Sequence, residues 1–194
     1  MTTDVDKKKQ NLRTQHRQQR RDLEAAGRSE EQALLDAQLE NICNKWDGPI
    51  AAYMAMSDEC SCQHLINVCF AQKRVLYVPK VAVPHRLTWH IIQSVEELAV
   101  GAYGIQEPTT EAQRLPEDIL LLCPGLAFNA AGQRLGMGGG FYDNVLSTLS
   151  TAACSIGLAW SCQIENEIPV EAHDANVDAV LVADRWISPK PNWL

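Results

Sequence analysis

Long apolar runs are absent from this chain of 194 residues. No run approaches the roughly 20 residues that a membrane-spanning helix needs. The richest one, DILLLCPGLAF, is interrupted by Pro124 and Gly125, so it predicts a buried strand. The N-terminal sequence MTTDVDKKKQ is polar and lacks the apolar core of a secretory signal. From these absences we expect a cytoplasmic protein with no membrane partner.

The chain also lacks a regular cysteine framework, because its seven cysteines are an odd number and share no repeated spacing. In a reducing compartment such thiols stay free, and a free cysteine usually behaves as a small buried hydrophobe. The CSC sequence at 60–62, with His64 close behind, leaves a metal site open as an alternative. A zinc site of this kind ordinarily needs a second, distant pair of ligands. We therefore interpret these cysteines as core residues.

Extremes of composition are missing as well. With 46% apolar and 21% charged residues, the chain has the balance of a soluble globular protein rather than a disordered one. It shows no internal repeat, no low-complexity segment and no linker that would mark a domain boundary. Its length suits one domain with a real core. We expect a single domain over residues 1–194, with residues 1–6 disordered.

The net charge of −7 hides a strong asymmetry. Residues 7–28 hold eight Lys and Arg against two acids, and the remainder of the chain holds nine basic residues against 22 acidic ones. Arg13, Arg17 and the pair Arg20 and Arg21 recur at helical spacing and share one face. This face is either a solvated basic surface or a surface that binds phosphate. Because the rest of the chain is acidic, we expect no nucleic-acid partner.

Hydrophobic periodicity predicts an alternation of helices and strands. Residues 7–45 are expected to be helical, with a division at Gly27 and with Ser29 as the N-cap of the second half. Short apolar runs bounded by turn residues predict strands at 50–56, 74–81, 87–93, 118–125, 154–160 and 178–184. Helical spacing predicts helices at 62–73 and 141–150. The βαβ unit over residues 50–81 favours a Rossmann-like, three-layer α/β/α sandwich with a mostly parallel sheet of about six strands.

Four glycines occupy positions 136, 138, 139 and 140 of the sequence RLGMGGGFYD, residues 134–143. This strip lies between the strongest predicted strand and a predicted helix, at the edge of a parallel sheet where open α/β folds bind ligands. Glycines let backbone N–H groups approach a ligand, and the start of a helix adds partial positive charge, so the strip is suited to phosphate oxygens. No Walker pattern is present, because no Lys-Ser or Lys-Thr pair follows. A flexible turn is the alternative interpretation.

Asp143 would lie beside this phosphate site, and its carboxylate would repel a triphosphate unless a cation intervened. Mg²⁺ is bound in this way, through one or two carboxylates together with phosphate oxygens and water. An acid that only stabilises the start of a helix is the alternative. Arg134 is suited to neutralise phosphate, and Phe141 and Tyr142 offer flat surfaces to a ring, although we favour core packing for Phe141.

The segment GLAFNAAGQRLGMGGGFYDNVL, residues 125–146, resembles the glycine-rich motif of 5-formyltetrahydrofolate cyclo-ligases. Further parts are similar in the same order: KQNLR, AYMAMSDE, YGIQEP and IGLAWSCQIENEIPVEAHDANVDAVL. The resemblance runs from about residue 7 to residue 186. Three positions depart from the family pattern: Asn129 stands where many members have Asp, Phe141 where many have Tyr, and Gly139 where Lys or Arg is frequent. The last change removes one charged contact to phosphate.

The resemblance implies a reaction in which ATP and 5-formyltetrahydrofolate give 5,10-methenyltetrahydrofolate, ADP and phosphate. It implies ATP as co-substrate, Mg²⁺ as cofactor and a reduced folate as substrate, and we expect a monomer. The residues implied to bind the nucleotide are Lys9, Arg13, Arg134, Leu135, Gly136, Met137, Gly138, Gly139, Gly140, Phe141 and Tyr142. Those implied to bind the folate are Met56, Glu59 and Tyr142, those implied to hold the metal are Asp143 and Asp174, and those implied to be catalytic are Arg134 and Tyr142.

Structural roles stay open for several of these residues. Glu59 could be a loop acid, Met56 a core residue and Asp174 the cap of a turn. The basic residues expected on a solvated helix face are Arg17, Arg20 and Arg21. The aromatic candidates for a wall against the folate, for which we favour core packing, are Tyr53, Trp89 and Tyr103.

Two other functions remain open at the level of sequence. A small-molecule kinase would share the phosphate site and Mg²⁺ but would leave a stable phosphorylated product. A non-catalytic protein could dock its basic helix on RNA, although no strand with interleaved aromatic residues supports that interpretation.

Overall fold

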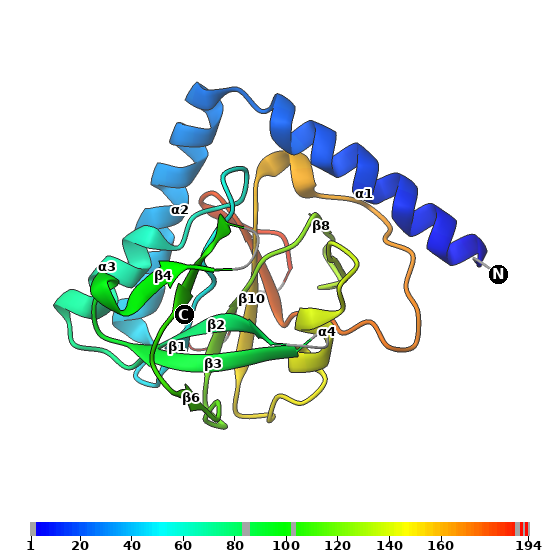
Figure 1. The fold of residues 1–194 in the computed structure, drawn as a ribbon. Coiled ribbons are helices and arrows are strands. Elements are labelled where there is room, and N and C mark those ends of the chain that lie inside the picture. Colours follow the sequence, from blue (N-terminus) through cyan, green and yellow to red (C-terminus); the bar gives the residue numbers. More distant parts are fainter. Residues whose placement is uncertain (1–2, 83–85, 102–103, 189–190, 192, 194) are drawn as a thin grey trace.

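The computed structural model of the chain describes residues 3–82, 86–101, 104–188, 191 and 193. Two long helices form a bent arm along one side of a central sheet (Figure 1). The helices are α1 (Asp4–Asp22), α2 (Ala25–Lys45), α3 (Gln63–Ala71) and α4 (Phe141–Leu146), with 3-10 turns η1 (Val95–Glu97) and η3 (Ser161–Gln163). The strands are β1 (Ile50–Ala51), β2 (Leu76–Ala82), β3 (Arg86–Ile92), β4 (Leu98–Val100), β5 (Gln106–Pro108), β6 (Ala112–Gln113), β7 (Leu120–Cys123), β8 (Ala127–Phe128), β9 (Arg134–Leu135), β10 (Cys154–Ala159), β11 (Ala179–Val182) and β12 (Arg185–Trp186).

The main sheet has eight strands in the order β12-β11-β10-β7-β1-β2-β3-β6. The five central strands, β11, β10, β7, β1 and β2, are parallel to one another. Outside them, β12 pairs antiparallel with β11, β3 with β2, and β6 with β3. Numbered among themselves along the chain, these five lie in the order 2-1-3-4-5, which is one of the doubly wound orders. The order reverses between β1 and β7, and the carboxyl ends of these two strands are therefore the expected place for a ligand.

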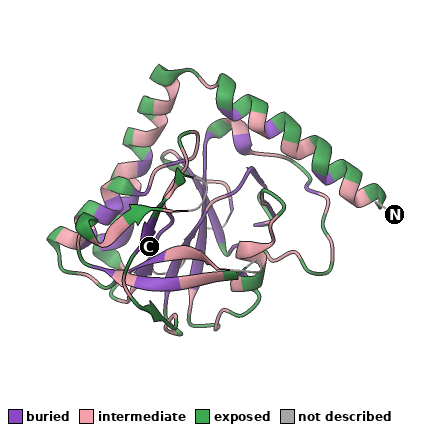
Figure 2. Cartoon of the chain, in the orientation of Figure 1, coloured by how far each residue is buried: buried purple, intermediate pink, exposed green. Residues whose placement is uncertain are grey.

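Alternate residues of the central strands enter two separate cores, as the two-residue period of a strand requires. Leu120 and Leu122 of β7 pack with α2 and α3, whereas Leu121 and Cys123 pack with α4 on the other face. The strands are accordingly buried on both faces, and they form the buried centre of the molecule in Figure 2. Helices cover both faces of a mainly parallel sheet, as the apolar runs predict.

Two predictions about the sheet differ from what is observed. The sheet has eight strands instead of about six, because the two-residue edge strands β6 and β12 are too short to show a period. The strand predicted at 50–56 ends at Ala51, and the chain then turns away from the sheet through residues 52–62.

Among the described residues, no helix has both the length and the apolar character that crossing a membrane requires.

Residues 3–6, within the segment 1–6 that we expected to be disordered, form the start of a helix. Helix α1 begins at Asp4, and Thr3 and Asp6 form a reciprocal capping box. The Thr3 hydroxyl accepts from Asp6 N at 3.1 Å, and Asp6 Oδ2 accepts from Thr3 N at 2.9 Å. These bonds satisfy two backbone N–H groups that the first turn of a helix otherwise leaves free. Met1 and Thr2 lie outside the described residues.

The two long helices separate at Leu23 and Glu24, not at Gly27 as predicted. A guanidinium from the second helix closes the end of the first: Arg28 Nη2 donates to the carbonyl oxygens of Arg20 and Arg21 at 2.6 and 3.2 Å. Gly27 lies within α2, and the hydroxyl of Ser29 bonds back to a carbonyl of the same helix. The bonds from Arg28 to the end of the first helix thus decide where the two helices separate, although Gly27 by itself favours a break in a helix.

A substitution in β10 tests the packing of the sheet against the loop after β7. The ring of Phe128 is fully buried, and a Cβ at Gly157 would lie 2.4 Å from ring atom Cε1. Because the ring has no room to move, we expect Gly157→Ala to lower the free energy of unfolding by about 1–3 kcal/mol, measured by urea denaturation.

Gly27→Ala is the matched control. Its added Cβ would meet only Leu23 Cδ1, at 3.6 Å, so it should raise the free energy of unfolding by about 0.5–1 kcal/mol. If Gly157→Ala unfolds at the same urea concentration as the wild-type protein, the packing of Phe128 against β10 is wrong.

Candidate functional site

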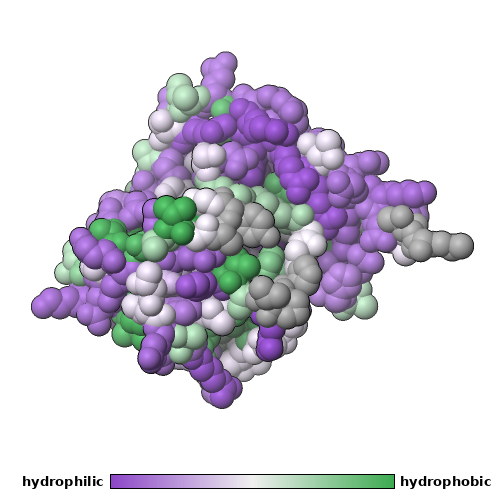
Figure 3. Space-filling model, viewed as in Figure 1, coloured by the Kyte–Doolittle hydropathy of each residue, from purple (hydrophilic) through white to green (hydrophobic). Residues whose placement is uncertain are grey.

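A cavity of about 360 Å³ opens where the strand order reverses. Its walls come from the loop after β1, from β2, β3 and β5, and from the segment that follows β7. The residues that line it are Tyr53, Met54, Met56, Glu59, Pro79, Val81, Leu87, Ile105, Glu107, Pro124, Gly125, Arg134, Gly136, Met137, Gly139, Gly140, Phe141, Tyr142 and Asp143. In Figure 3 this face shows apolar residues gathered below the hydrophilic arm of α1 and α2. The cavity is thus largely apolar, with a few charged groups at its edge.

The glycine strip forms an arc of backbone, residues 136–140, between β9 and α4. Gly138 and Gly140 have φ angles of +105° and +66°, a region that other residues rarely adopt. Within the described part of the chain, the backbone N–H groups of this arc donate no hydrogen bond to a backbone acceptor. Unpaired N–H groups on a curved backbone are the donors that a phosphate group requires. The arc therefore has the geometry predicted for a phosphate site.

Arg134 links the start of the arc to its end. Its Nη2 donates to Asp143 Oδ1 at 2.8 Å, its Nη1 donates to Pro124 O at 3.3 Å, and its guanidinium lies 5.7 Å from the centre of the Tyr142 ring. The side chain is buried, and its Nε has no hydrogen-bond partner among the described residues. Burial raises the pKa of the Tyr142 phenol well above its ordinary value, so this hydroxyl is neutral and able to donate.

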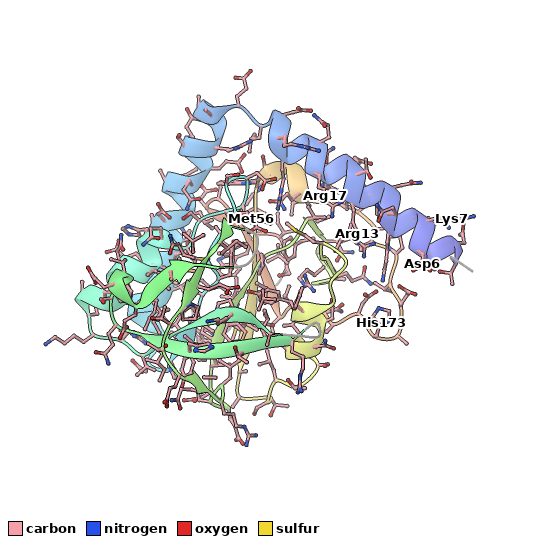
Figure 4. The ribbon with its side chains drawn as sticks, in the orientation of Figure 1. Asp6, Lys7, Arg13, Arg17, Met56 and His173 are labelled. Carbon is pink, nitrogen blue, oxygen red and sulfur yellow. The ribbon has the colours of Figure 1, made fainter. Side chains whose placement is uncertain are left out.

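Helix α1 lies directly over the arc (Figure 4). Arg13 Nε donates to Gly136 O at 3.0 Å, and Arg17 Nη2 donates to Met137 O at 3.3 Å. The expectation that Arg17 stays on a solvated face was therefore wrong in part, because this side chain reaches the arc. Both guanidinium groups bond to carbonyl oxygens of the arc, which leaves its N–H groups free for another acceptor.

Lys9 is almost fully buried and binds two carboxylates. Its Nζ lies 2.7 Å from Glu171 Oε2 and 2.5 Å from Asp174 Oδ2. Burial by itself would lower the pKa of Lys9, but the hydrogen bonds that it donates to Asp174 and Glu171 outweigh this effect and raise it. Burial would likewise raise the pKa of Asp174, but the bonds from Lys9 and from Glu171 N–H lower it. The imidazole of His173 is exposed 3.7 Å from Asp174 (Figure 4).

The two acids predicted to hold a metal lie on the same side of the molecule. Asp143 Oδ1 is 3.5 Å from the backbone N of Ala175, the neighbour of Asp174. Among the described residues, no group of three or more His, Cys, Asp or Glu side chains is arranged to hold a metal ion. Asp143 Oδ2 has no hydrogen bond to the described part of the chain, and Mg²⁺ needs only one or two carboxylates when phosphates supply further oxygens. The residues present therefore fit a shared Mg²⁺ site, although they do not form a complete one.

Glu59 and Met56 lie together in the cavity wall that the loop after β1 forms. Met56 N donates to Glu59 Oε2 at 3.0 Å, and the Glu59 side chain is 8% exposed. Burial raises the pKa of Glu59, whereas the Met56 N–H group and the guanidinium of Arg20 act in the opposite direction. Arg20 corrects another prediction: it is fully buried against Asp58 instead of lying on a solvated face. Arg21, in contrast, is exposed as expected.

The aromatic candidates fall into three groups. Tyr53 lines the cavity and donates its hydroxyl to Cys60 O at 2.7 Å. Trp89 is buried in the core under α4 and does not line the cavity. Tyr103 lies outside the described residues. The cysteines at 60 and 62 are both buried, and burial raises the pKa of the Cys62 thiol, while His64 bonds to Glu40 on the surface.

Sequence reasoning missed functional candidates whose neighbours are distant along the chain. Glu107 is buried in the cavity wall, and its Oε1 accepts from Val81 N at 3.3 Å. The YGIQEP sequence contains this residue, so a signal existed, but no role followed from it. Glu171 and Arg20 gave no local signal, because each acts through a partner far away in the sequence.

A model of the 5-formyltetrahydrofolate cyclo-ligase family matches residues 5–183, which include every part of the site described above. The chain belongs to this family. The 5-formyltetrahydrofolate cyclo-ligase of Haemophilus influenzae is 32% identical over 185 residues, which cover 90% of this chain and 97% of that protein. The enzyme of that name from Mus musculus is 30% identical over 195 residues, which cover 93% and 96%.

Solved structures agree with the family assignment. The 5,10-methenyltetrahydrofolate synthetase of Aquifex aeolicus is 28% identical and matches with a TM-score of 0.76, over 91% of this chain and 90% of that one. The synthetase of Mycoplasma pneumoniae is 22% identical and matches with a TM-score of 0.73, over 91% and 99%, which supports the fold alone.

Two of the three departures from the family's motif have structural reasons. Asn129 shapes a turn through Oδ1, which accepts from Ala131 N and Gln133 N, and its Nδ2 donates to Gln133 Oε1 at 2.7 Å, a bond that an aspartate could not donate. A Cβ at Gly139 would lie 2.6 Å from the ring of Phe141. The ring occupies the space that a side chain at position 139 would need, which accounts for the glycine, whereas nothing in the structure explains Phe in place of Tyr at position 141.

Lys9→Met tests the attachment of α1. The change leaves Asp174 and Glu171 without their cation, so we expect the free energy of unfolding at pH 7 to fall by roughly 1–3 kcal/mol in urea denaturation. Because its pKa is lowered on folding, Asp174 contributes stability above its ordinary pKa of 3.8, and this is lost as pH falls through the lowered value. Lys9 contributes stability at pH values below its ordinary pKa of 10.5, and this stability is lost as pH rises through the raised pKa.

Lys8→Met is the control, because the Lys8 side chain is 63% exposed and pairs only with Asp4 on the helix surface. It should leave the free energy of unfolding close to that of the wild-type protein, because an exposed ion pair on a helix surface contributes little to stability. Equal effects of the two substitutions, or a Lys9→Met effect that does not shrink in acid, would contradict the buried pair.

Proposed function

We propose that this protein converts 5-formyltetrahydrofolate to 5,10-methenyltetrahydrofolate with the consumption of ATP. One observation carries the proposal. A backbone arc with unpaired N–H groups and a largely apolar cavity with a buried acid meet at the switch point of a chain that belongs to this family. The arc suits a triphosphate, and the cavity suits a flat heterocycle.

The chemistry explains why both sites must adjoin. A formamide carbonyl is a weak electrophile, and its oxygen is a poor leaving group. Transfer of the γ-phosphoryl group to that oxygen makes it a good one, and the second folate nitrogen then closes the ring as phosphate departs. The protein therefore has to align the formyl oxygen with the γ-phosphate and stabilise the charge that develops. No nucleophilic side chain is required.

Residues of the arc and of α1 bind the nucleotide in this proposal. The N–H groups of residues 136–140 donate to phosphate oxygens, and Arg13 adds positive charge from α1, while Lys9, paired with Asp174 and Glu171, holds this end of the helix beside the nucleotide. The guanidinium of Arg134 lies in the cavity wall, held by Asp143 and Pro124, so its positive charge stabilises the group in transfer. Leu135 keeps the arc in register, because its carbonyl accepts from Leu126 N at 2.7 Å. Met137 and Phe141 contribute apolar surface at the rim of the cavity.

Asp143 and Asp174 are the residues that would hold Mg²⁺. A bound magnesium ion supplies charge that neutralises the triphosphate and orients its oxygens. Asp143 offers Oδ2 for this purpose, while its Oδ1 keeps Arg134 in place. Asp174 keeps Lys9 in place through its Oδ2.

Residues at the other end of the cavity bind the folate. Glu59 accepts hydrogen bonds from the N–H groups of the pteridine, and Met56 packs against the ring. Tyr142 lies between the two ends and, as a neutral phenol, donates to the formyl oxygen or to the phosphoryl group next to it. The apolar residues of β2 and β3 exclude water, which protects the activated intermediate.

Partners and location form part of the same proposal. Two cations of the basic segment, Lys9 and Arg20, are buried and paired, which leaves a weaker cationic surface for RNA, and we propose no nucleic-acid partner. We also propose that the protein acts as a monomer in the cytoplasm. All seven cysteines are free, as is usual for a protein of a reducing compartment.

The direct test incubates purified protein with ATP, Mg²⁺ and 5-formyltetrahydrofolate and follows the absorbance of the methenyl product. We expect this product to form together with ADP in equal amount, and to cease forming when EDTA removes Mg²⁺. A stable phosphorylated folate in place of the methenyl product would support the kinase alternative and contradict the proposal.

Asp143→Asn tests the residue that connects the arc to the metal. The substitution keeps the shape of the side chain but removes its charge, so kcat/KM should fall by about 100-fold or more, because loss even of an outer contact to a metal ligand costs about 10–100-fold. Asp184→Asn, a change at an exposed acid in the turn between β11 and β12, should leave kcat/KM unchanged. Circular dichroism checks that both variants are folded, and a fully active Asp143→Asn would contradict the proposed role.

A further inference from the structure

Arg20 of α1 lies behind the folate end of the cavity, and the roles given above make no use of it. Its side chain is 2% exposed. Nε and Nη2 both donate to Asp58 Oδ2, at 3.1 and 2.7 Å. The third nitrogen, Nη1, is buried without a hydrogen-bond partner among the described residues, and it lies 3.7 Å from Glu59 Oε1. A buried guanidinium thus bonds to one acid and faces another.

Glu59 is poorly solvated and has few charged neighbours. Burial raises the pKa of its carboxyl, Asp58 raises it further, and the N–H group of Met56 and the charge of Arg20 lower it. The other titratable groups near Glu59 are thiols and phenols that stay neutral because burial raises their pKa, namely Tyr53, Cys60, Cys62 and Tyr142. Among the described residues, the charges that act most strongly on Glu59 are therefore those of Arg20 and Asp58, with opposite signs, and the charged groups that share its cavity are Glu107, Arg134 and Asp143.

We infer that Arg20 is a positioning residue for folate binding: anchored on Asp58, its guanidinium keeps Glu59 ionised and aimed into the cavity. The inference rests on the proposed function, in which Glu59 accepts hydrogen bonds from the pteridine. An ionised carboxylate offers both oxygens to neighbouring N–H groups, whereas a carboxylic acid uses one oxygen to carry its proton. Helix α1 thereby serves the folate end of the cavity as well as the nucleotide end.

The test compares the pH dependence of kcat/KM for the folate in matched variants, with a blank without protein at each pH. Arg20→Gln keeps a hydrogen-bond donor but removes the charge. The acid side of its kcat/KM profile should move to higher pH by about one unit, because an adjacent opposite charge shifts the pKa of a carboxyl by at least that much. At pH values on this acid side the KM for folate should rise, whereas kcat at saturating folate should change little. Arg20→Lys should restore the acid side of the profile.

Asp58→Asn is expected to act in the opposite direction. It removes the negative neighbour of Glu59 and leaves Arg20 to face Glu59 alone, so the acid side of the profile should move to lower pH. Arg21→Gln is the control, because the side chain of this neighbouring arginine is exposed and, among the described residues, donates only to Arg17 O, at 3.1 Å. Its profile should coincide with that of the wild-type protein. If Arg20→Gln does not fold, Asp58→Asn carries the test.

The failures of the two proposals are distinguishable. A wild-type protein that forms no methenyl product contradicts the proposed function, and the pH dependence of folate binding, followed by tryptophan fluorescence, then decides on Arg20. A wild-type protein that turns over, with an unchanged acid side of the profile in Arg20→Gln or in Asp58→Asn, overturns the inference about Arg20 alone. An equal loss of kcat/KM at every pH in Arg20→Gln also overturns it, because that result indicates a merely structural residue.

Discussion

The site depends on the attachment of α1 to the rest of the chain by buried ion pairs. This helix has only two aliphatic residues, Val5 and Leu12, so apolar burial alone cannot hold it in place. Lys9 and Arg20 are instead buried against acids of distant loops, and His16 lies 2.8 Å from Glu165. Burial of a charge is costly unless its partner has the right geometry, and such contacts therefore favour one position of the helix.

This attachment connects the two halves of the proposed reaction. Lys9 and Arg20 are 11 residues apart, a span of about 16 Å along a helix. Near one end of this span the helix binds Asp174, beside Asp143 and the arc, and at the other end it binds Asp58, beside Glu59. A single rigid element thus determines how far the phosphate site lies from the folate site. A phosphoryl transfer between two bound molecules requires such a fixed distance.

Sequence reasoning was most successful where the chemistry is local. The strip from Arg134 to Asp143 shows its glycines, its acid and its flanking strand within a short stretch, and the structure has the predicted arc there. Resemblance to the family added residues with weak local signals, such as Glu59. It did not reveal Arg20, whose acidic partner lies 38 positions away and leaves no periodic trace. The division of the long helices was misplaced for a similar reason, because the guanidinium of Arg28 closes the first helix through space.

The central claim is that α1 and the arc together enclose the nucleotide tail beside the formyl group. A crystal structure of the protein with ADP, Mg²⁺ and 5-formyltetrahydrofolate tests it most directly. The account predicts the β-phosphate on the N–H groups of residues 136–140 under Arg13, the ion on Asp143, and the pteridine on Glu59. A nucleotide bound away from the arc, or a pteridine outside the cavity, would contradict the account.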